Sequence, residues 1–388
     1  MASSFNLLEL LPALPWLAPF ATLPRLASNR PNLAASPPLL GPRVSIIIPA
    51  RNEADSIEAV VRSILASSYR PFELLIVDDR STDATATIVE RMAAQDDRVR
   101  HIRGEPLPAG WFGKPWACFQ GYREATGDLL LFTDADTTHE PELLGRAVGA
   151  LRAESAELLT VSPRQLCETF WERVVMPQIW LLLGIRYHPS RVNAAVRERD
   201  VIANGQFILV GRDSYEAVGT HETVRSEIAE DLALAQAFLR GGRKLHFVFA
   251  ESLMQTRMYR SLPDLIEGWS KNVYLGGRRS FPHEPLLRAL VPAMLAAALG
   301  FWLIPPAGLL IGATAGELAP AAGLATGLSA LFWMLISYGM RIPVLYGLLY
   351  PLGALVALYI AARSTWRGER RVEWRGRTYG GPGSATDG

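Results

Sequence analysis

The sequence has few cysteines and no excess of either charge. Two of its 388 residues are cysteine, Cys118 and Cys167, too few for a disulfide framework or a cysteine-rich zinc site. Lysine and arginine number 39 against 38 acidic residues, so the net charge of +1 gives no general affinity for nucleic acid. The chain also lacks a GxGxxG fingerprint and a P-loop, which disfavours a dinucleotide oxidoreductase and a kinase-like nucleoside triphosphatase.

Apolar residues are abundant and unevenly distributed. From Leu286 to Ala362 the only charged residues are Arg288, Glu317 and Arg341. We therefore predict a transmembrane region at residues 282–362. Its apolar segments are each long enough for a bilayer core of about 30 Å, and they run over Leu286–Ile304, Leu318–Met340 and Ile342–Ala362.

Charge near the C-terminus predicts the orientation of this region. The tail at residues 363–388 is basic, with arginines at positions 363, 367, 370, 371, 375 and 377. The positive-inside rule places such a tail in the cytoplasm. If the catalytic part is also cytoplasmic, the number of crossings between them must be even, and three segments conflict with that. Either one segment lies in the interface, or the region interrupted by Pro305-Pro306 supplies a fourth crossing.

The N-terminal residues 1–42 are predicted to be an apolar segment followed by a linker. Phe5–Pro24 is apolar but contains four prolines and has no basic residue before Arg25, which is unlike a cleaved signal peptide. We expect an interfacial or short anchoring segment. Residues 29–42, rich in Pro, Ala and Ser, are typical of a linker.

Residues 43–281 show an alternation of strand and helix patterns. Strands are predicted at 44–48, 74–77, 99–102 and 129–132, and helices at 55–66, 85–94, 114–125 and 142–151. Such alternation predicts an α/β domain with a mainly parallel sheet covered on both faces. Ligands of these sheets lie outside the carboxyl ends of the strands. Polar clusters follow three of the strands, at 51–53, 78–83 and 134–136.

The pair Asp134 and Asp136 follows an apolar strand at a spacing of two residues. Residues so spaced on a strand point to the same side, so both carboxylates can meet one cation. Hard cations such as Mg²⁺ take carboxylate oxygens and complete their shell with water and substrate phosphates. The pair therefore indicates a metal-bound diphosphate substrate; the alternative is a polar turn.

The cluster after the second strand has two interpretations. Ser81, Thr82 or Asp83 would cap the helix that begins near Ala84. Capping explains Asp79 less well, because a carboxylate facing the cleft can accept hydrogen bonds from a base or a ribose. Glu53 could favour a helix N-terminus through the dipole or line a nucleotide pocket.

The loop Trp111–Trp116 is unusually apolar, and Lys114 stands at the start of a helix. The helix dipole disfavours a cation there, and a phosphate partner would resolve the conflict. The alternative is a loop buried against the core or the membrane, with Lys114 extending to solvent.

Glu230 and Asp231 open a further helix pattern. Neighbouring helix positions are about 100° apart, so we expect the two carboxylates not to face the same point. One of them could simply favour the helix dipole. Beside the aspartate pair, a further carboxylate would suit a general base.

Taken in order, these clusters resemble a membrane-bound family 2 glycosyltransferase with the nucleotide-sugar-binding GT-A fold. The resemblance covers about Val44–Arg279. It implies that Pro49, Glu53 and Asp79 surround the nucleoside, with Lys114 and Asp134 near the nucleotide. It also implies that Asp136 binds Mg²⁺ or Mn²⁺ on the diphosphate and that Asp231 is the catalytic base.

Two further stretches, 113–118 and 269–272, resemble the carotenoid- and hopanoid-associated subgroup. Processive members of the family carry a QxxRW sequence, whereas here Gln255 is followed by Met258-Tyr259, which favours a single transfer. Glu230, Arg257, Trp269 and Lys271 are assigned to the acceptor or donor site.

The implied function is inverting, metal-dependent transfer of one sugar, with a UDP-sugar as the first candidate donor, to a hydroxyl or carboxyl group of a membrane lipid. The enzyme would be a multi-pass protein of the cell membrane with its catalytic domain in the cytoplasm, and nucleic acid is not expected as a partner. A helix at about 168–184 and the residues after it could form an acceptor entry surface; the candidates there and nearby are Trp171, Trp180, Arg186, Tyr187, His188 and His221. The aromatic residues fit a plain buried helix equally well.

Alternatives remain within and outside this interpretation. The acceptor could be a carotenoid, a hopanoid, a sphingolipid or a polyprenyl phosphate. A catalytically silent nucleotide-sugar-binding membrane protein would keep the same fold. A sugar nucleotidyltransferase also uses an α/β sheet and paired carboxylates, but it would not need the membrane region.

Overall fold

The computed structural model describes residues 7–28, 30–316 and 319–368, followed by the backbone of three short strands, β11 (Val372–Trp374), β12 (Arg377–Tyr379) and β13 (Ala385–Asp387). Several residues used above lie outside the described ones: Phe5, Glu317, Leu318, Arg370, Arg371 and Arg375.

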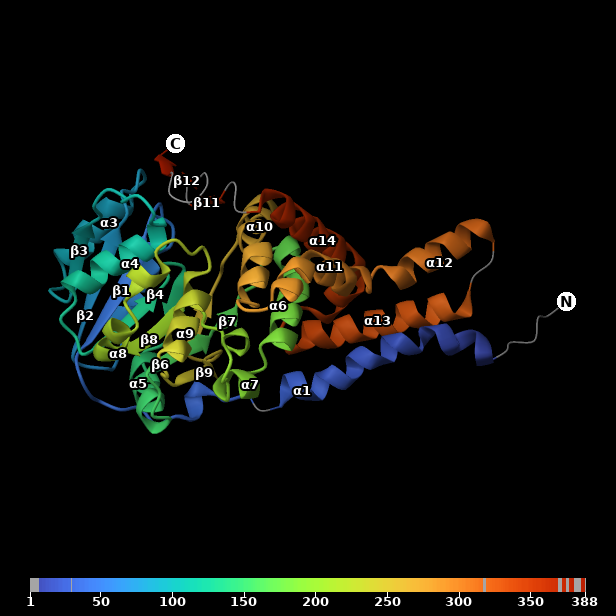
Figure 1. Ribbon diagram of the computed structural model, residues 1–388, viewed down its shortest axis with the longest axis horizontal. Helices are drawn as coiled ribbons and strands as arrows, with labels where there is room; N and C mark the ends of the chain where they lie inside the picture. Colours follow the sequence, from blue (N-terminus) through green and yellow to red (C-terminus); the bar gives the residue numbers. More distant parts are fainter. Residues whose placement is uncertain are drawn as a thin grey trace.

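A seven-stranded sheet forms the centre of the catalytic part (Figure 1). Its strands are β1 (Val44–Ala50), β2 (Phe72–Asp78), β3 (Val99–Arg103), β4 (Leu129–Thr133), β6 (Leu158–Ser162), β8 (Phe207–Gly211) and β9 (Leu245–Phe249). The order is β3-β2-β1-β4-β8-β6-β9, and β8 alone runs antiparallel to its neighbours. The predicted mainly parallel α/β fold is confirmed.

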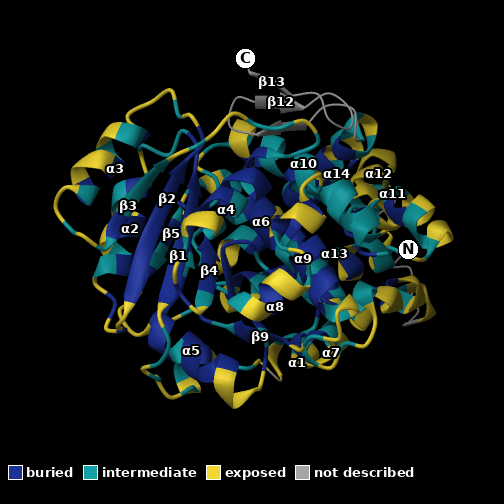
Figure 2. Ribbon diagram, turned by 60° about the vertical axis from the view of Figure 1, so that its left-hand side comes forward, coloured by how far each residue is buried: buried dark blue, intermediate teal, exposed yellow. Residues whose placement is uncertain are grey.

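Helices cover both faces of this sheet because the buried strands alternate their side chains. Ile46 and Ile48 of β1 pack with α2 (Ile57–Leu65), α3 (Thr85–Ala93) and α5 (Leu143–Ala153), whereas Ile47 packs on the other side with α4 (Gly113–Glu124), α8 (Arg212–Ala217) and α9 (Glu230–Arg240). Strands β1 and β2 are buried throughout, as Figure 2 shows.

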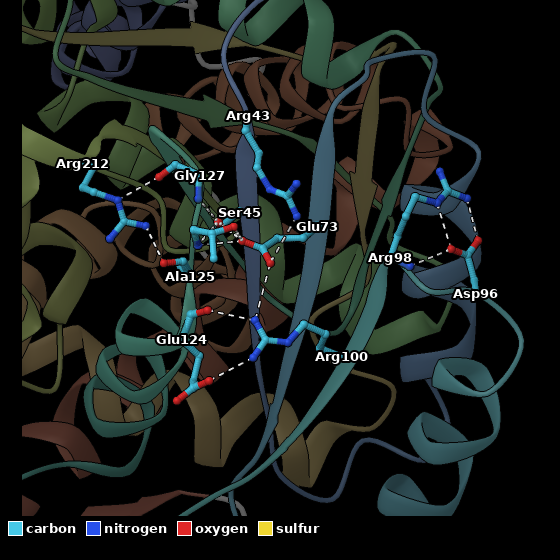
Figure 3. A network of polar contacts seen from close by, with 11 residues as sticks. Arg43, Ser45, Glu73, Asp96, Arg98, Arg100, Glu124, Ala125, Gly127 and Arg212 are labelled. Carbon is cyan, nitrogen blue, oxygen red and sulfur yellow. Dashed lines mark hydrogen bonds and ion pairs between the residues drawn. The ribbon is translucent and has the colours of Figure 1, made fainter.

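The amino ends of the strands hold a polar network centred on Glu73 of β2 (Figure 3). Its carboxylate accepts a hydrogen bond from Ser45 Oγ at 2.6 Å and lies 3.6 and 3.5 Å from the guanidinium groups of Arg43 and Arg100. Burial would raise the pKa of Glu73, but hydrogen bonds from Ser45 and Thr126 hold it below its usual value. This charged cluster thus ties strands together at the edge opposite the polar loops.

A small sheet and two long helices lie at the carboxyl ends of the strands, on the side of the polar loops. The sheet contains β5 (Thr137–His139), β7 (Arg164–Gln165) and β10 (Met254–Thr256). Helix α6 (Phe170–Arg186) begins at a capping box formed by Thr169 and Glu172, and α7 (Pro189–Asn193) follows it. Helix α10 (Leu262–Arg279) leads into the apolar region.

The apolar region consists of α11 (Pro285–Gly300), α12 (Ile304–Ala315), α13 (Pro320–Gly339), the 3-10 helix η5 (Val344–Leu349) and α14 (Tyr350–Arg367). Two described helical stretches are long and apolar enough to cross a membrane, Pro320–Gly339 and Val344–Arg367. The pair α11 and α12, bent by 53°, would make a third. Pro305 and Pro306 fall in the first turn of α12, where a missing N–H is tolerated.

The N-terminal segment forms a 3-10 helix η1 (Leu7–Thr22) and α1 (Leu23–Ala27), which run beside α13 (Figure 1). Trp16 stacks on Phe301 at 5.0 Å between ring centroids, and Phe20 meets Phe332 at 5.6 Å. The predicted linker then packs along α5, where Arg146 donates to the carbonyl of Ser36 at 2.6 Å.

Candidate active site

The polar loops after β1 and β4 open into one large cavity of about 1430 Å³. Ten of the eleven predicted site residues line it: Pro49, Glu53, Lys114, Asp134, Asp136, Glu230, Asp231, Arg257, Trp269 and Lys271. They come from loops and helices spread over more than 200 positions of the chain, from Pro49 to Lys271. The fold therefore brings together residues that the sequence could only place in order.

The remaining predicted residue, Asp79, is fully buried and does not appear among the described residues that line the cavity. Its backbone N–H donates to Ala50 O at 2.8 Å, and its carbonyl accepts from Arg51 Nη1 at 2.6 Å. Glu53, in contrast, lines the cavity and accepts a hydrogen bond from Ser56 Oγ at 2.9 Å. The nucleoside-binding role therefore stays a prediction for both residues, and the geometry favours Glu53.

The cluster Ser81–Asp83 joins two loops as well as beginning a helix. Asn52 N donates to Ser81 Oγ at 3.0 Å, and Thr82 N donates to Asn52 Oδ1 at 2.8 Å. Asp83 Oδ1 accepts from Thr85 N at 3.0 Å and so satisfies one free N–H at the start of α3, but the N-cap position itself is Ala84 and has no side-chain cap. These bonds hold the loops after β1 and β2 in one position at the cavity rim.

Lys114 projects from the first turn of α4 and meets two carboxylates. Its Nζ lies 2.8 Å from Asp134 Oδ1 and 2.9 Å from Glu230 Oε1. Burial alone would lower the pKa of Lys114, but Asp134 and Glu230 raise it well above its usual value. The charge at this helix start is therefore balanced by carboxylates, a solution that the sequence argument did not consider.

The aromatic residues around Lys114 pack on one another. Trp111 contacts Trp116 and Phe119 at centroid distances of 5.1 and 5.2 Å. Trp116 also donates to the carbonyl of Glu105 at 3.2 Å. The alternative of a packed aromatic loop is thus correct for the rings, while Lys114 itself points into the cavity.

Asp231 is held by two backbone groups at the start of α9. Gly205 N donates to Asp231 Oδ2 at 3.0 Å, and Leu232 N donates to Oδ1 at 2.7 Å. Burial, reinforced by the negative charge of Glu230, raises the pKa of Asp231 from 3.8 to about 6. The pKa of Glu230 is lowered instead: burial would raise it, but the charge and hydrogen bond of Lys114 outweigh that effect.

The expectation that Glu230 and Asp231 would not face the same point is wrong. Both line the cavity and both interact with the charge of Lys114. The angle of about 100° between neighbouring helix positions describes only the directions in which the two Cβ atoms leave the helix. The longer side chain of Glu230 reaches Lys114, while Asp231 accepts a hydrogen bond from Gly205 N.

Gly205 is a site residue that the sequence argument missed. A Cβ added there would lie 2.9 Å from Lys114 Nζ and 3.3 Å from Asp231 Oδ2. A side chain would therefore displace the lysine or the carboxylate. The only available signal was the dipeptide Asn204-Gly205, which indicates a turn and nothing more.

The aspartate pair suits a cation that is shared with a substrate. Asp134 pairs with Lys114, and Asp134 and Asp136 both line the cavity, so the assignment of the metal to Asp136 stays a prediction. Within the described ranges, no group of three or more His, Cys, Asp or Glu side chains could hold a metal ion by itself. Mg²⁺ and Mn²⁺ accept such an incomplete set of hard oxygen ligands, because donor phosphates and water complete their shell.

Arg257, Trp269 and Lys271 form part of the cavity wall. Arg257 pairs with Glu168 at 2.7 Å and with Glu172 at 3.1 Å, so it also anchors the start of α6. Trp269 Nε1 donates to the sulfur of Met176 at 3.3 Å. Lys271 contributes to the lowered pKa of Glu230.

The predicted acceptor-side residues divide into two groups. Trp180, Arg186, Tyr187 and His188 line the cavity. His221 is buried with Tyr215, whose hydroxyl lies 2.6 Å from His221 Nδ1, and burial lowers the pKa of His221 to about 4. That histidine is structural. Trp171 packs against Phe170 and the neighbouring helices, which fits the buried-helix alternative.

Comparison with known proteins relates the chain to a family of transferases. Residues 45–219 match the family described as glycosyl transferase family 2. The chain is 27% identical over 248 residues to a 4,4'-diaponeurosporenoate glycosyltransferase of Staphylococcus haemolyticus, covering 63% of this chain and 64% of the relative. The match to the protein of that name in Staphylococcus aureus (strain USA300) is 26% over 244 residues, covering 62% and 63%. The chain thus spans less than two thirds of the length of these relatives.

Among solved structures, a mannosyltransferase from Pyrobaculum calidifontis, in complex with GDP-Man and Mn²⁺, superimposes with a TM-score of 0.60. The superposition covers 94% of this chain and all of that one, at 20% identity. At that identity the likeness concerns the fold, and it confirms the predicted GT-A class with its C-terminal helices.

Proposed function

We propose that this chain, whose residues 45–219 form a glycosyl transferase family 2 domain, transfers a single sugar from a nucleotide-sugar donor to a membrane lipid. One observation carries the proposal. The cavity that holds Lys114, Asp136 and Asp231 continues between the apolar helices α11, α13 and α14. A soluble acceptor would not need that continuation.

The donor is placed at the carboxyl ends of β1 and β4. Pro49 and Glu53 line the cavity on the β1 side, where the family resemblance puts the nucleoside. Asp134 and Asp136 lie on the β4 side, with Lys114 beside them. When bound, Mg²⁺ or Mn²⁺ at Asp136 would supply charge neutralisation for the departing diphosphate. A UDP-sugar is the first donor to test.

Asp231 is assigned the proton transfer. With a hydroxyl acceptor, its carboxylate takes the proton of that hydroxyl, whose oxygen attacks the anomeric carbon while the bond from that carbon to the diphosphate breaks. A carboxyl acceptor is already ionised at neutral pH and attacks in the same way without this proton transfer. The displacement inverts the anomeric centre and releases the nucleoside diphosphate. A base with its pKa near 6 is ionised at neutral pH and is still a stronger base than an ordinary aspartate.

Lys114 and Gly205 position this base. Lys114 binds Glu230 and Asp134, so it links the carboxylate pair to the start of α9. Gly205 N holds one oxygen of Asp231, and Leu232 N holds the other. Each carboxylate oxygen retains a second lone pair that an acceptor hydroxyl can approach.

Membrane crossings are proposed for η1 with α1, for the bent pair α11 with α12, and for α13. The bent pair would cross the membrane away from the catalytic side, and α13 would cross it back. The number of crossings between the catalytic domain and the tail would therefore be even. Helix α14 then belongs to the catalytic side. Its packing on α6 and α10 and the ion pair of Arg363 with Glu267 at 2.9 Å support that position. Catalytic domain and tail would both face the cytoplasm.

The acceptor class is best tested by lipid mass spectrometry of cells with and without the protein. The names of the relatives favour a carotenoid acid as the first acceptor to look for. A glycolipid present only with the protein would support the proposal, and unchanged lipids would contradict it. Donor hydrolysis without an acceptor would separate an enzyme from a silent binding protein of the same fold.

A further inference from the structure

The part of the cavity between helices α11, α13 and α14, here called the apolar arm, is lined by Val291, Met294 and Leu295 of α11, Leu335 and Gly339 of α13, and Ile360 of α14. Ligand pockets for small molecules usually measure about 300–1,000 Å³. The whole cavity, at about 1430 Å³, is larger than one such ligand requires.

The chemistry of the apolar arm selects its occupant. Among its described lining residues beyond position 284, only Arg341 carries a charge. A sugar or a nucleotide placed there would lose hydrogen bonds to water without replacement, which is costly. A hydrocarbon chain would instead bury apolar surface on both sides. The occupant that fits is the chain of the acceptor lipid, with its reactive end at Asp231.

Two glycines in the wall leave space that a side chain would fill. A Cβ added at Gly276 of α10 or at Gly339 of α13 would meet no heavy atom within 4 Å; both residues line the cavity, Gly276 half-buried and Gly339 exposed. The neighbouring Gly277 differs, because its added Cβ would lie 2.8 Å from Val291 Cγ1. Gly277 therefore allows α10 to approach α11, whereas Gly276 faces open space.

Gly276 also lies at the junction between the polar and apolar parts of the cavity. Its carbonyl accepts from Ser280 N and from Ser280 Oγ, each at 2.9 Å, and the Ser280 hydroxyl contacts the hydroxyl of Tyr187. Lys271 lies one and a half turns earlier on the same helix and lines the polar part. A lipid chain that leaves the reaction centre would pass Gly276 first.

We infer that Gly276 and Gly339 keep the apolar arm wide enough for a long hydrocarbon chain and so determine which acceptor chain lengths are used. This inference rests on the proposed transfer to a membrane lipid. The test is Gly276→Leu in the full-length protein in lipid nanodiscs, with geraniol and geranylgeraniol, or the matched isoprenoid acids, as short and long acceptors. A helix interior favours leucine over glycine, so the substitution should not weaken α10.

The expected result is a loss of kcat/KM for the long acceptor of at least about tenfold, the size that added volume in a packed space produces. Activity on the short acceptor should fall less than activity on the long one, and donor hydrolysis, which needs no acceptor chain, should stay near wild type. Gly327→Leu on α13 is the matched control, because its added Cβ also meets nothing within 4 Å and it is absent from the cavity lining. Gly339→Leu gives an independent second measurement.

The outcomes separate the two proposals. Wild-type protein that transfers to neither acceptor would count against the proposed function. Wild-type activity combined with Gly276→Leu and Gly339→Leu variants that treat short and long acceptors as the wild type does would overturn the inference. Circular dichroism and nucleotide binding identify a variant that has lost its fold.

Discussion

Glu230→Gln should move the acid side of the pH profile toward lower pH. In the proposed reaction the ionised form of Asp231 is active, so kcat/KM should rise with pH through the pKa of Asp231, about 6. The charge of Glu230 is one of the causes that raise this pKa. Its removal also frees Lys114 from one of its two ion-pair partners, which should lower the pKa of Asp231 further.

The size of the shift follows from the order of the causes. The pKa of Asp231 rises from 3.8 to about 6, and each pKa unit corresponds to about 1.4 kcal/mol. Burial is the largest cause and Glu230 the second, and glutamine leaves the burial unchanged. We therefore expect a displacement of about one pH unit, less than the full return to an ordinary aspartate.

The assay is initial-rate transfer at donor and acceptor concentrations below KM, from about pH 3 to about pH 8, because kcat/KM reports the pKa values of groups in the free enzyme. Glu251→Gln is the control. Glu251 also lines the cavity but pairs with Arg30 and is not among the causes of the Asp231 shift. An acid limb that stays at the wild-type position in Glu230→Gln, or a wild-type limb near 4, would refute the reasoning.

Three further changes test separate parts of the site. Asp231→Asn should reduce transfer by about 10²- to 10⁴-fold while nucleotide binding persists, and wild-type turnover in that variant would contradict the role of the base. Asp136→Ala should remove the Mn²⁺-dependent part of nucleotide binding in calorimetry; equal affinity with and without Mn²⁺ in the wild type would argue against the metal site. Gly205→Ala should lower kcat by up to about 100-fold, because the new methyl group displaces Lys114 or Asp231. Gly211→Ala, whose added Cβ would lie 3.7 Å from Ser214 Oγ, is its control and should remain active.

The secondary structure of the first half of the catalytic part could be predicted closely. β1 and β2 are buried at every position, and α2 has its buried residues at helical spacing, so the pattern of apolar residues was sufficient. The strands β6, β8 and β9 of the same sheet were not predicted. Their order in the sheet depends on pairing between segments about 50 to 90 residues apart, which a local pattern does not contain.

The membrane part shows a similar division. Hydropathy located the apolar segments, because transfer from water to lipid depends on composition. It did not show that η1 runs beside α13 or that α11 and α12 are bent by 53°, since those features depend on packing between helices.

By itself, the sequence determined the residue types of this protein's site and their order: a carboxylate pair after a strand, a lysine at a helix start, and two acids opening another helix. It did so because each cluster is local and has its own spacing. Only the tertiary structure decided which of these groups form ion pairs with one another. Lys114 binds Asp134 and Glu230, and this arrangement, with burial, leaves Asp231 as the carboxylate with the raised pKa. The fold also buries Asp79 and joins the polar site to the apolar arm, because burial and cavities arise from contacts between distant segments.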